Sequence, residues 1–490
     1  MGSLGAAVLI LAVAAATPAA TSAHPERSAA AGGAESKGTS AHPERSVAAG
    51  GAESKGTSAH PESSAAAGGA ESQGDAPELT LDAALAELER QNLTLAQARS
   101  RAEEAGAGVD QARAALLPSL SASASYTRNS DDARVAIGDL LSLLPLPPGT
   151  PLPKPITIQP LEQLSAGGAL RVPLVVPSAW FDVRSARSAA RAADAQADAV
   201  RLQLRAGLAQ AAHGARAAEE VVVASERALE IAAEHARSAD RRVKAGVAAP
   251  LDALRGRTEQ VRRESDLARA RAELGRARLA LGILLGREGP VRIGVPDAVA
   301  AAPPDPASLA AEAVGRRPEV RAQAAQVAAA EAQVGATWAR LAPQLSATGS
   351  AFASDVAYPT GEKEGWRATL DLTWPIFDGG LREARRRQAR AQLAGARAGA
   401  EAQRLAVVQE VTDGARDLAV ARERLRLAET QRGLAADAAD SARRSFEAGV
   451  ASSLDVIDAN DRLYQADVGL ADARARLAQA GIALERALGR

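Results

Sequence analysis

The feature that most constrains this chain of 490 residues is a motif that occurs twice inside long helical patterns. Ala-Gly-Val-Ala-x-x-Leu-Asp stands at residues 245–252 and again at residues 448–455, an offset of 203 (449 − 246). Glycine ends a helix readily because it adopts the left-handed conformation, and a following Ser, Asp or Pro can start the next helix. The sequence therefore predicts a duplicated chain in which each half turns sharply, at Gly246 and Val247 and at Gly449 and Val450. The alternative is an ordinary helical hairpin turn, which explains one copy well but two copies in fixed register poorly.

The offset of 203 holds without a gap to the Leu-Gly-Arg triplets at residues 285–287 and 488–490. It divides the chain into a first repeat over residues 77–290, a linker over residues 291–305 and a second repeat over residues 306–490. A chain of this length usually forms two or more domains. The duplication indicates instead two halves of one unit.

Charge and cysteine content exclude several functions. The net charge is −1, so no electrostatic argument supports binding to nucleic acid. The charges are interleaved, as on solvated helix faces. The chain contains no cysteine, which excludes disulfides, thiolate metal sites, a cysteine nucleophile and a lipid anchor on cysteine.

The N-terminal segments are predicted to lie outside the folded part. Residues 1–23 carry an apolar run that is too short to span a bilayer and end in small residues suited to cleavage, so we expect a secretory signal peptide, although the usual basic start is missing. Residues 24–76 repeat an 18-residue unit rich in Gly, Ser and Ala, which cannot bury enough surface to fold. Three histidines recur with the unit; copied linker sequence explains them better than a metal-binding tail.

Each repeat alternates helical and strand patterns in the same order. In the first, helical periodicity runs over residues 79–117, a strand pattern follows at 120–127, and a Pro-rich loop at 143–155 leads to a returning strand at 168–174. A helical pattern then continues from Pro177 to Ala245, on the order of 100 Å at ~1.5 Å per residue. The second repeat shows helix to residue 341, strands at 345–348 and 366–374, and a second long helix to Ala448.

The strand at residues 366–374 is the clearest in the chain. Trp366 and Trp374 stand at the two ends of its apolar face, about 26 Å apart at ~3.3 Å per residue. An outer-membrane strand needs an apolar band of similar height with aromatic residues at both edges. We therefore predict that Tyr126, Trp366 and Trp374 lie at the membrane interfaces. An amphipathic strand of a soluble sheet is the alternative for any one strand.

This pattern resembles the outer membrane efflux protein family, the TolC-like channels. Val-Pro-Leu at residues 172–174 and Trp-Pro-Ile-Phe-Asp-Gly-Gly at residues 374–380 are similar to the family's strand-to-helix junctions, and residues 446–459 to its periplasmic turn. The resemblance implies a mainly α fold with a membrane β part. Long antiparallel helices would form an α-barrel tunnel, and four strands per chain would complete a twelve-stranded transmembrane barrel in a homotrimer. A periplasmic adaptor and an inner-membrane pump would be the partners, with outer membrane lipid around the barrel.

The strand count supports a trimer without the resemblance. Four strands cannot close a barrel, and an open sheet edge is not tolerated in lipid. Known outer-membrane barrels begin at about eight strands. Three copies of four strands would give a closed wall.

The resemblance also places a gate beyond the turns. Aspartates that line the closed periplasmic end in the family correspond to Asp252, Asp455 and Asp458. Threefold symmetry would gather them into carboxylate rings that attract cations. A helix cap or first-turn acid is the alternative role. The sequence departs from the family at Phe446, where a tyrosine hydroxyl can make a closing hydrogen bond, and at Ala451, where an arginine can pair with a carboxylate, so we expect closure to rest more on packing.

We therefore predict an outer membrane channel of a tripartite efflux or type I secretion system that extends into the periplasm. The chain carries no acid/base motif that indicates an enzyme, and we expect no cofactor and no metal site. The alternatives are an exported coiled-coil scaffold, which has no need of four strands flanked by Trp, and a periplasmic adaptor, which usually carries one helical hairpin joined to β-rich domains. The sequence leaves open whether the cargo is a small molecule or a protein.

Overall fold

The structure, a computed structural model, describes residues 78–135, 138, 147, 155–296, 306–357 and 361–490. The chain divides into two compact units, Met1–Ala70 and Glu71–Arg490, and every described residue belongs to the second. The expected signal peptide, the repetitive segment 24–76, most of the Pro-rich loop and most of the linker lie outside the described residues. The segment boundaries expected from the sequence therefore stay predictions.

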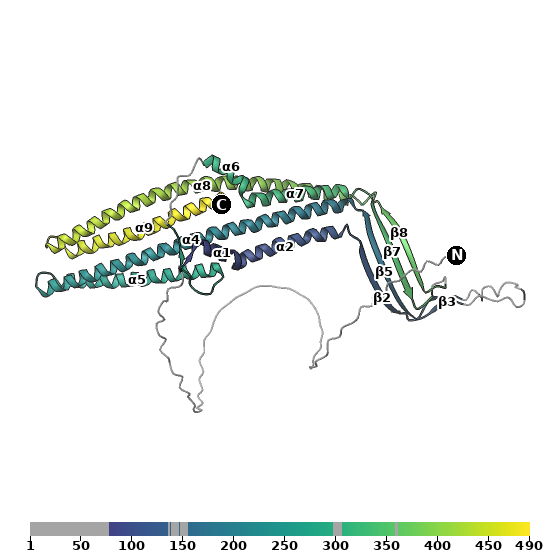
Figure 1. Ribbon diagram of the computed structural model, residues 1–490, viewed down its shortest axis with the longest axis horizontal. Helices are drawn as coiled ribbons and strands as arrows, with labels where there is room; N and C mark the ends of the chain where they lie inside the picture. The colour runs from purple at the N-terminus through teal and green to yellow at the C-terminus, as the bar shows by residue number, and fades with distance from the viewer. Residues whose placement is uncertain (1–77, 136–137, 139–146, 148–154, 297–305, 358–360) are drawn as a thin grey trace, which may run out of the picture. The chain divides into compact units, whose positions relative to one another are not determined.

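The second unit contains the two repeats in the expected order (Figure 1). The first repeat comprises β1 (Leu79–Thr80), α1 (Leu81–Gln91), α2 (Leu93–Ala114), β2 (Ser119–Arg128), β3 (Ala133–Val135), β4 (Ile156–Gln159), β5 (Glu162–Val175), α4 (Pro177–Lys244), α5 (Pro250–Leu285) and β6 (Ile293–Gly294). The second comprises α6 (Pro306–Arg316), α7 (Pro318–Ala339), β7 (Gln344–Ser354), β8 (Glu364–Thr373), α8 (Leu381–Glu447) and α9 (Ser453–Ala487).

Two rods dominate the unit. Helix α4 has 68 residues and α8 has 67, which at ~1.5 Å per residue gives each a length of about 100 Å. Helix α5 folds back along α4 and α9 folds back along α8, and the two hairpins meet through α4 and α9 (Figure 1). Between the hairpins and the sheet, α2 and α7 pack on either side of α4, and α8 packs on α7. The helices therefore form one layer that continues into the sheet.

Both hairpin turns and both repeat ends use the same glycine cap. The backbone N–H of Val247 donates to the carbonyl of Arg242 (3.0 Å) and that of Val450 to the carbonyl of Ser445 (2.9 Å), the six-to-one bond of a Schellman motif. The glycine before each valine is left-handed, with φ of 74° at Gly246 and 79° at Gly449. Gly286 and Gly489 repeat this geometry after α5 and α9.

The two repeats also have equivalent cores. Leu208, Leu281 and Leu285 are fully buried in the first repeat, where α1, α4 and α5 meet. The residues 203 positions later are Val411, Leu484 and Leu488, and all of them are buried where α6, α8 and α9 meet. Val291 and Ile293, which follow α5, add to the first core. The duplication thus extends from the turn motif to the packing of the rods.

The expectation of one continuous helix over residues 79–117 is wrong. Asn92 interrupts it in an extended conformation, and its side-chain oxygen accepts the N–H of Leu95 (3.0 Å) to cap α2. The Asn92 amide also donates to the Leu284 carbonyl (2.9 Å), a contact 192 residues away. In the second repeat, α6 and α7 are separated in the same way at Arg317, because a residue before proline avoids the helical conformation.

The four long strands form one antiparallel sheet in the order β2-β5-β7-β8. The register aligns residues in rows that alternate between the two faces of the sheet. Ala122, Gly168, Ala351 and Trp366 form one row across the sheet, and Ser123, Gly167, Phe352 and Gly365 form the next row on the opposite face. The expected strands are therefore present, with β5 and β7 longer than predicted. Two short pairs, β3 with β4 and β1 with β6, had no counterpart in the sequence patterns.

Large apolar side chains on one face of this sheet are exposed. Leu120, Leu170, Trp366 and Leu370 belong to this face, and Trp366 is 81% exposed. The polar face carries serines and threonines, with the Ser125 and Ser165 hydroxyls 2.8 Å apart. Such a surface needs an apolar environment on one side only.

Within the described ranges, none of the helices combines the length and the apolar character needed to cross a membrane.

Candidate functional site

The tips of the two helical hairpins are the first candidate site. Val247 and Val450 follow the left-handed glycines and are 67% and 83% exposed. Helix α5 then begins with Pro250 in its first turn, whereas α9 begins with a side-chain cap at Ser452. The four turn residues predicted from the sequence thus lie at the free ends of the rods.

Asp455 caps its own helix. Ser452 and Asp455 form a capping box, in which the Ser452 hydroxyl accepts the Asp455 N–H (3.3 Å) and the Asp455 carboxylate accepts the Ser452 N–H (2.8 Å). Hydrogen bonds from the Ser452 hydroxyl and backbone hold the pKa of Asp455 below its usual value. Its carboxylate is exposed and stays charged at neutral pH.

The other two predicted aspartates each have an arginine nearby on their own helix. Asp458, one turn beyond Asp455, pairs with Arg462 at 2.8 Å, and both side chains are exposed. Asp252 lies in the first turn of α5, where its carboxylate is 3.7 Å from the Arg255 guanidinium and its side chain is 25% exposed. Each arginine lies within about one helical turn of its aspartate, so both carboxylates stay near the tip of the hairpin.

A contact between the two repeats lies just above the tips. The His235 ring of α4 makes a 2.8 Å hydrogen bond with the Ser453 hydroxyl of α9, and both residues are buried. The Phe446 ring of α8 lies 5.1 Å from the His235 ring, and the Arg242 guanidinium lies 4.5 Å from the Phe446 ring centroid. Arg242 also donates to the Phe446 carbonyl. We call these four residues the tip latch.

The latch was not predicted as a site. Phe446 is 7% exposed, so its ring is packed within the chain, and the expectation that closure rests more on packing stays a prediction. The polar links through His235 and Arg242 were not foreseen. The one sequence signal was that His235 is one of two histidines outside the N-terminal repeats.

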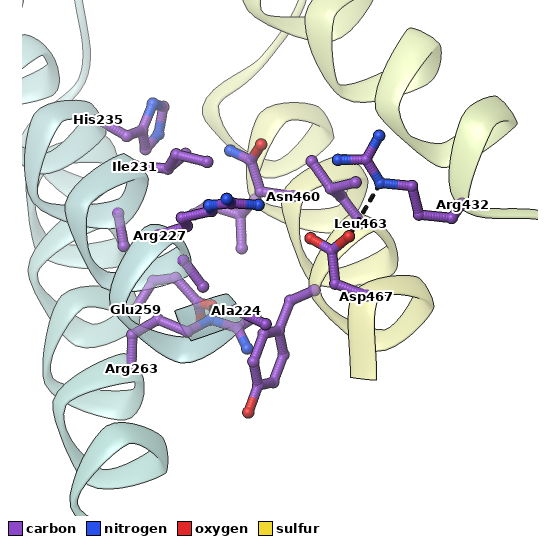
Figure 2. Close-up of a pocket in the computed structure, with 14 residues that line it drawn as sticks. Ala224, Arg227, Ile231, His235, Glu259, Arg263, Arg432, Asn460, Leu463 and Asp467 are labelled. Carbon is purple, nitrogen blue, oxygen red and sulfur yellow. Dashed lines mark hydrogen bonds and ion pairs between the residues drawn. The ribbon is translucent and has the colours of Figure 1, made fainter. Parts of the chain in front are cut away.

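A cavity of about 220 Å³ opens next to the latch, between α4 and α5 on one side and α8 and α9 on the other (Figure 2). Its wall is largely apolar, with Ile231, Ile457 and Leu463 among the lining residues. Arg432 of α8 closes one side through an ion pair with Asp467 of α9 at 3.0 Å. The two hairpins are therefore not packed tightly along this part of their interface.

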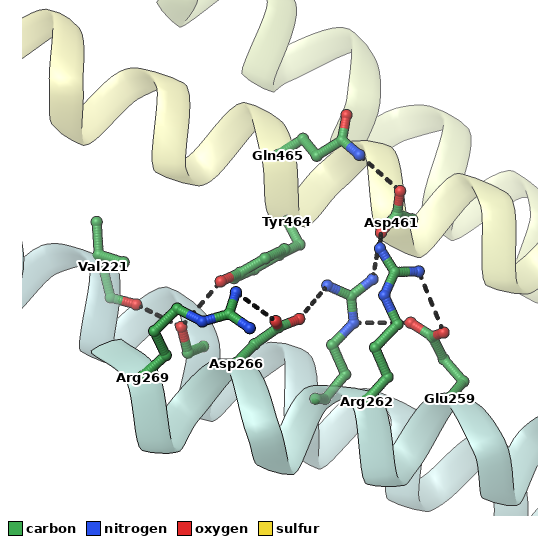
Figure 3. Close-up of polar contacts among 10 residues, drawn as sticks. Val221, Glu259, Arg262, Asp266, Arg269, Asp461, Tyr464 and Gln465 are labelled. Carbon is green, nitrogen blue, oxygen red and sulfur yellow. Dashed lines mark hydrogen bonds and ion pairs between the residues drawn. The ribbon is translucent and has the colours of Figure 1, made fainter. Parts of the chain in front are cut away.

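A buried arginine in the wall of this cavity joins α5 to α9, and Figure 3 shows the polar contacts in this region. The Arg263 side chain is 3% exposed and contacts carboxylates of Glu259 (2.7 Å), Asp266 (3.3 Å) and Asp461. Its guanidinium also lies 4.6 Å from the ring of Tyr464. Burial alone would lower the pKa of Arg263, but the surrounding carboxylates raise it above its usual value. The charge is thus fully compensated, as a buried ion requires.

The predicted interface aromatics lie in the sheet. Tyr126 is near the end of β2 and is 61% exposed. Trp366 is on the exposed apolar face of β8, and Trp374 follows the last residue of that strand. The Trp374 indole donates to the Leu341 carbonyl at 3.1 Å, which ties the end of the sheet to the end of α7.

Comparison with known proteins decides the family. The sequence matches the family described as "Outer membrane efflux protein" over residues 84–287 and 309–490. The chain belongs to the outer membrane efflux protein family. It is 28% identical over 420 residues to the cobalt-zinc-cadmium resistance protein CzcC of Cupriavidus metallidurans, covering 85% of this chain and 91% of CzcC. It is 30% identical over 271 residues to the outer membrane protein OprJ of Pseudomonas aeruginosa, covering 51% of this chain and 53% of OprJ.

The fold agrees with the family. The structure of the outer-membrane channel OprN superposes with a TM-score of 0.68 at 25% identity, covering 84% of this chain and 89% of OprN. The expected resemblance and fold class are thereby confirmed. The protein is an outer membrane efflux channel whose helices extend into the periplasm. The scaffold and adaptor alternatives find no support.

Proposed function

We propose that three copies of this chain form one channel that works with a periplasmic adaptor and an inner-membrane pump. The observation that carries the proposal is the four-stranded sheet. Among the described strands, β2 pairs only with β5 and β8 only with β7, so each outer strand has a free edge of ten residues. Such edges cannot remain open in lipid.

The strand directions allow closure between copies. Every neighbouring pair in the order β2-β5-β7-β8 is antiparallel, so β8 of one copy can pair antiparallel with β2 of the next. An even number of strands per chain lets this pattern close without a parallel pair. Three copies would give a twelve-stranded barrel with its apolar face toward lipid and Tyr126, Trp366 and Trp374 at the interfaces.

Mass measurement tests the assembly. The purified protein should need detergent and should run as a complex of three chains by light scattering after the detergent mass is subtracted. Co-purification with an adaptor and a pump from native membranes should depend on the same complex. A monodisperse monomer that is soluble without detergent would contradict the proposal.

The gate belongs to the same proposal. We infer that the aspartates at the tips, Asp252, Asp455 and Asp458, line the narrow periplasmic end as threefold rings. The exposed, ionised Asp455 carboxylate supports this placement. The Arg462 partner of Asp458 and the Arg255 neighbour of Asp252 would weaken the negative potential of their rings. Asp455 should therefore contribute most to cation attraction.

Conductance tests the gate. Asp455→Ala with Asp458→Ala should lower the preference for cations severalfold in a planar bilayer, because the charge that concentrates cations is lost. Conductance should rise, because the rings no longer hold cations in the narrow end or repel anions from it. A matched control is Asp472→Ala with Glu485→Ala, which removes two carboxylates farther along α9. Unchanged selectivity and conductance in the folded double mutant of the tip would place the constriction elsewhere, for example at Phe446 or Val450.

The similarity to CzcC and the carboxylates at the tips support a proposal for the class of cargo. CzcC, whose name refers to cobalt, zinc and cadmium resistance, matches over 91% of its length. Carboxylate rings would pass such cations readily, so we infer small ions or molecules rather than folded proteins as cargo. Deletion of the gene in its host should then raise sensitivity to these metals or to small organic toxins, with protein secretion unchanged.

A further inference from the structure

The helices carry an unusual charge where they leave the sheet. The first ten residues of α8, Leu381–Arg390, contain five arginines and one carboxylate, and residues 177–191 of α4 contain three arginines and one carboxylate. The whole chain has a net charge of −1. These two stretches therefore carry a net positive charge, whereas the chain as a whole does not.

Four of these arginines occupy equivalent positions in the two repeats. Arg184 and Arg187 on α4 correspond to Arg387 and Arg390 on α8 by the offset of 203. All four side chains are exposed, and no hydrogen bond or ion pair joins them to another side chain in the described parts of the chain. Farther along α8 the pattern differs, because Arg404 pairs with Glu401 and Arg426 with Glu423.

Apolar side chains lie directly above this level. Trp180 is 68% exposed and shares a face of α4 with Arg184 and Arg187, because the three stand at i, i+4 and i+7. Ile376 and Phe377, just before α8, are 81% and 86% exposed. Exposed tryptophan next to a transmembrane region marks the boundary between lipid and water. The arginines thus lie just outside the apolar layer, on the periplasmic side.

The direction of the helices brings these side chains toward the membrane. Both α4 and α8 begin at the sheet, and side chains in a helix lean toward its N-terminus. The N-termini themselves carry partial positive charge. The cap residues Val176 and Gly380 make no side-chain capping bond, and the first turn of α4 has no acidic residue. In α8 the Asp378 carboxylate accepts the Arg382 N–H at 3.1 Å, so the N-terminus of α4 is the less neutralised of the two.

We propose that Arg184, Arg187, Arg387 and Arg390 bind the phosphate groups of anionic phospholipids in the periplasmic leaflet of the outer membrane. The guanidinium group suits this role because it binds phosphate through two parallel hydrogen bonds and stays charged. Three copies of the chain would form a belt of twelve such arginines around the channel, which rests on the trimer proposed above. The belt would fix the depth of the channel in the bilayer.

Tryptophan fluorescence in vesicles tests the proposal, because all four tryptophans of the chain belong to the sheet or the adjoining helix ends. The purified channel is reconstituted in phosphatidylcholine that contains brominated phosphatidylglycerol or brominated phosphatidylcholine, and the quenching is compared. Each arginine near a charged surface contributes about 1 kcal/mol, or about fivefold in local lipid concentration. Wild type should therefore prefer phosphatidylglycerol at least about fivefold, and high salt should reduce the preference.

The variant with Arg184→Gln, Arg187→Gln, Arg387→Gln and Arg390→Gln should lose the preference. A matched control changes four exposed arginines elsewhere on the same two helices: Arg227→Gln, Arg237→Gln, Arg241→Gln and Arg424→Gln. It should keep the preference at the same net charge. The corresponding lysine variant at the four belt positions should retain most of it.

Equal preference in wild type and the belt variant would overturn the proposal, as would an equal loss in the control. A belt variant that keeps the preference but no longer binds the adaptor would show that the arginines serve a protein. If the belt variant does not assemble, the lipid preference of wild type at low and high salt and that of the lysine variant test the proposal instead. Absence of any preference in wild type overturns it. Failure of the membrane placement itself would differ, because neither brominated lipid would then quench.

Discussion

His235 is a buried titratable residue that joins the two repeats. Its ring lies between Ser453 and Phe446, and burial lowers its pKa while the nearby Asp252 carboxylate opposes the shift. The other charged groups near it are Arg227 and Arg242 on α4, Glu259 and Arg263 on α5, Arg432 on α8 and Asp467 on α9. The neutral ring is thus the form that the folded latch favours.

We predict that acid weakens the latch. Because the folded state holds His235 at a lowered pKa, the unfolded state binds more protons, and stability falls as pH drops below the unfolded pKa of about 6.5. Thermal unfolding of the trimer at neutral pH and at about pH 5 measures this loss. His235→Gln should show a smaller loss than wild type.

His213→Gln serves as a comparison, because burial also lowers the pKa of His213 but its ring has no partner in the latch. It should likewise reduce the pH dependence of unfolding. Only His235→Gln should change the pH dependence of channel conductance. Identical pH profiles of unfolding in wild type and His235→Gln would show that the ring is not held neutral.

At the scale of helices and strands, local sequence patterns were sufficient to predict much of the fold. The rods, the four long strands and the glycine turns depend on periodicity and on single residues such as Gly449, so the sequence predicts them. The break at Asn92 was missed because its second partner, Leu284, is 192 residues away. The pair of β1 with β6 was missed because each strand has two residues, too few for a period.

The latch escaped prediction for the same physical reason. His235 and Arg242 lie in an alanine-rich helix, and their partners Phe446 and Ser453 lie more than 200 residues later. No spacing within one helix indicates such a contact. The duplication did predict that the two turns lie at equivalent positions, but the contact between the repeats joins residues that are not equivalent.

The turn glycine has a testable energetic role. Gly449 has φ of 79°, and the nearest atom to the place that a Cβ would occupy is the Arg242 guanidinium nitrogen at 3.9 Å, an ordinary contact distance. Gly449→Ala would therefore suffer only from backbone strain. The left-handed conformation costs a residue with a Cβ roughly 1–2 kcal/mol, so the free energy of unfolding should fall by about that amount.

The matched substitution is Gly433→Ala, in the interior of α8, where a Cβ would meet nothing within 4 Å. It should raise the free energy of unfolding by roughly 0.5–1 kcal/mol, because alanine is the better helix former. Denaturant unfolding in the same detergent measures whether the free energy of unfolding falls in Gly449→Ala and rises in Gly433→Ala. Equal effects would mean that the turn does not determine the stability of the hairpin.

At the scale of the whole molecule, the sheet of a single chain lacks partners for its apolar face and its outer edges. The apolar face with Leu120, Leu170 and Trp366 is exposed, and the outer edges of β2 and β8 have no partner among the described strands. The outer helices also expose large apolar side chains, for example Leu254 of α5 and Leu434 of α8. The sheet edges differ from them because they leave backbone hydrogen-bonding groups without a partner among the described strands. Assembly should therefore depend mainly on the sheet edges.

The absence of cysteine from the chain makes this assembly directly testable. Ser123→Cys on the polar face of β2 is combined in turn with Arg367→Cys, Thr369→Cys or Asp371→Cys on the polar face of β8. Opposed side chains in adjacent antiparallel strands have Cβ atoms about 4.5–5.5 Å apart, so a short thiol cross-linker joins only positions in register. One of the three pairs should give covalent dimers and then covalent trimers on a denaturing gel.

Ser123→Cys with Leu370→Cys is the matched control, because Leu370 lies on the apolar face and its thiol would point away from that of residue 123. Each single substitution should give no cross-link, since it supplies only one of the two edges. If every polar-face pair failed to react in channels that remain in the outer membrane, the three registers that these pairs test would be excluded. A ladder that stopped at dimers would exclude a closed ring of three, because a ring joins every β8 edge to a β2 edge.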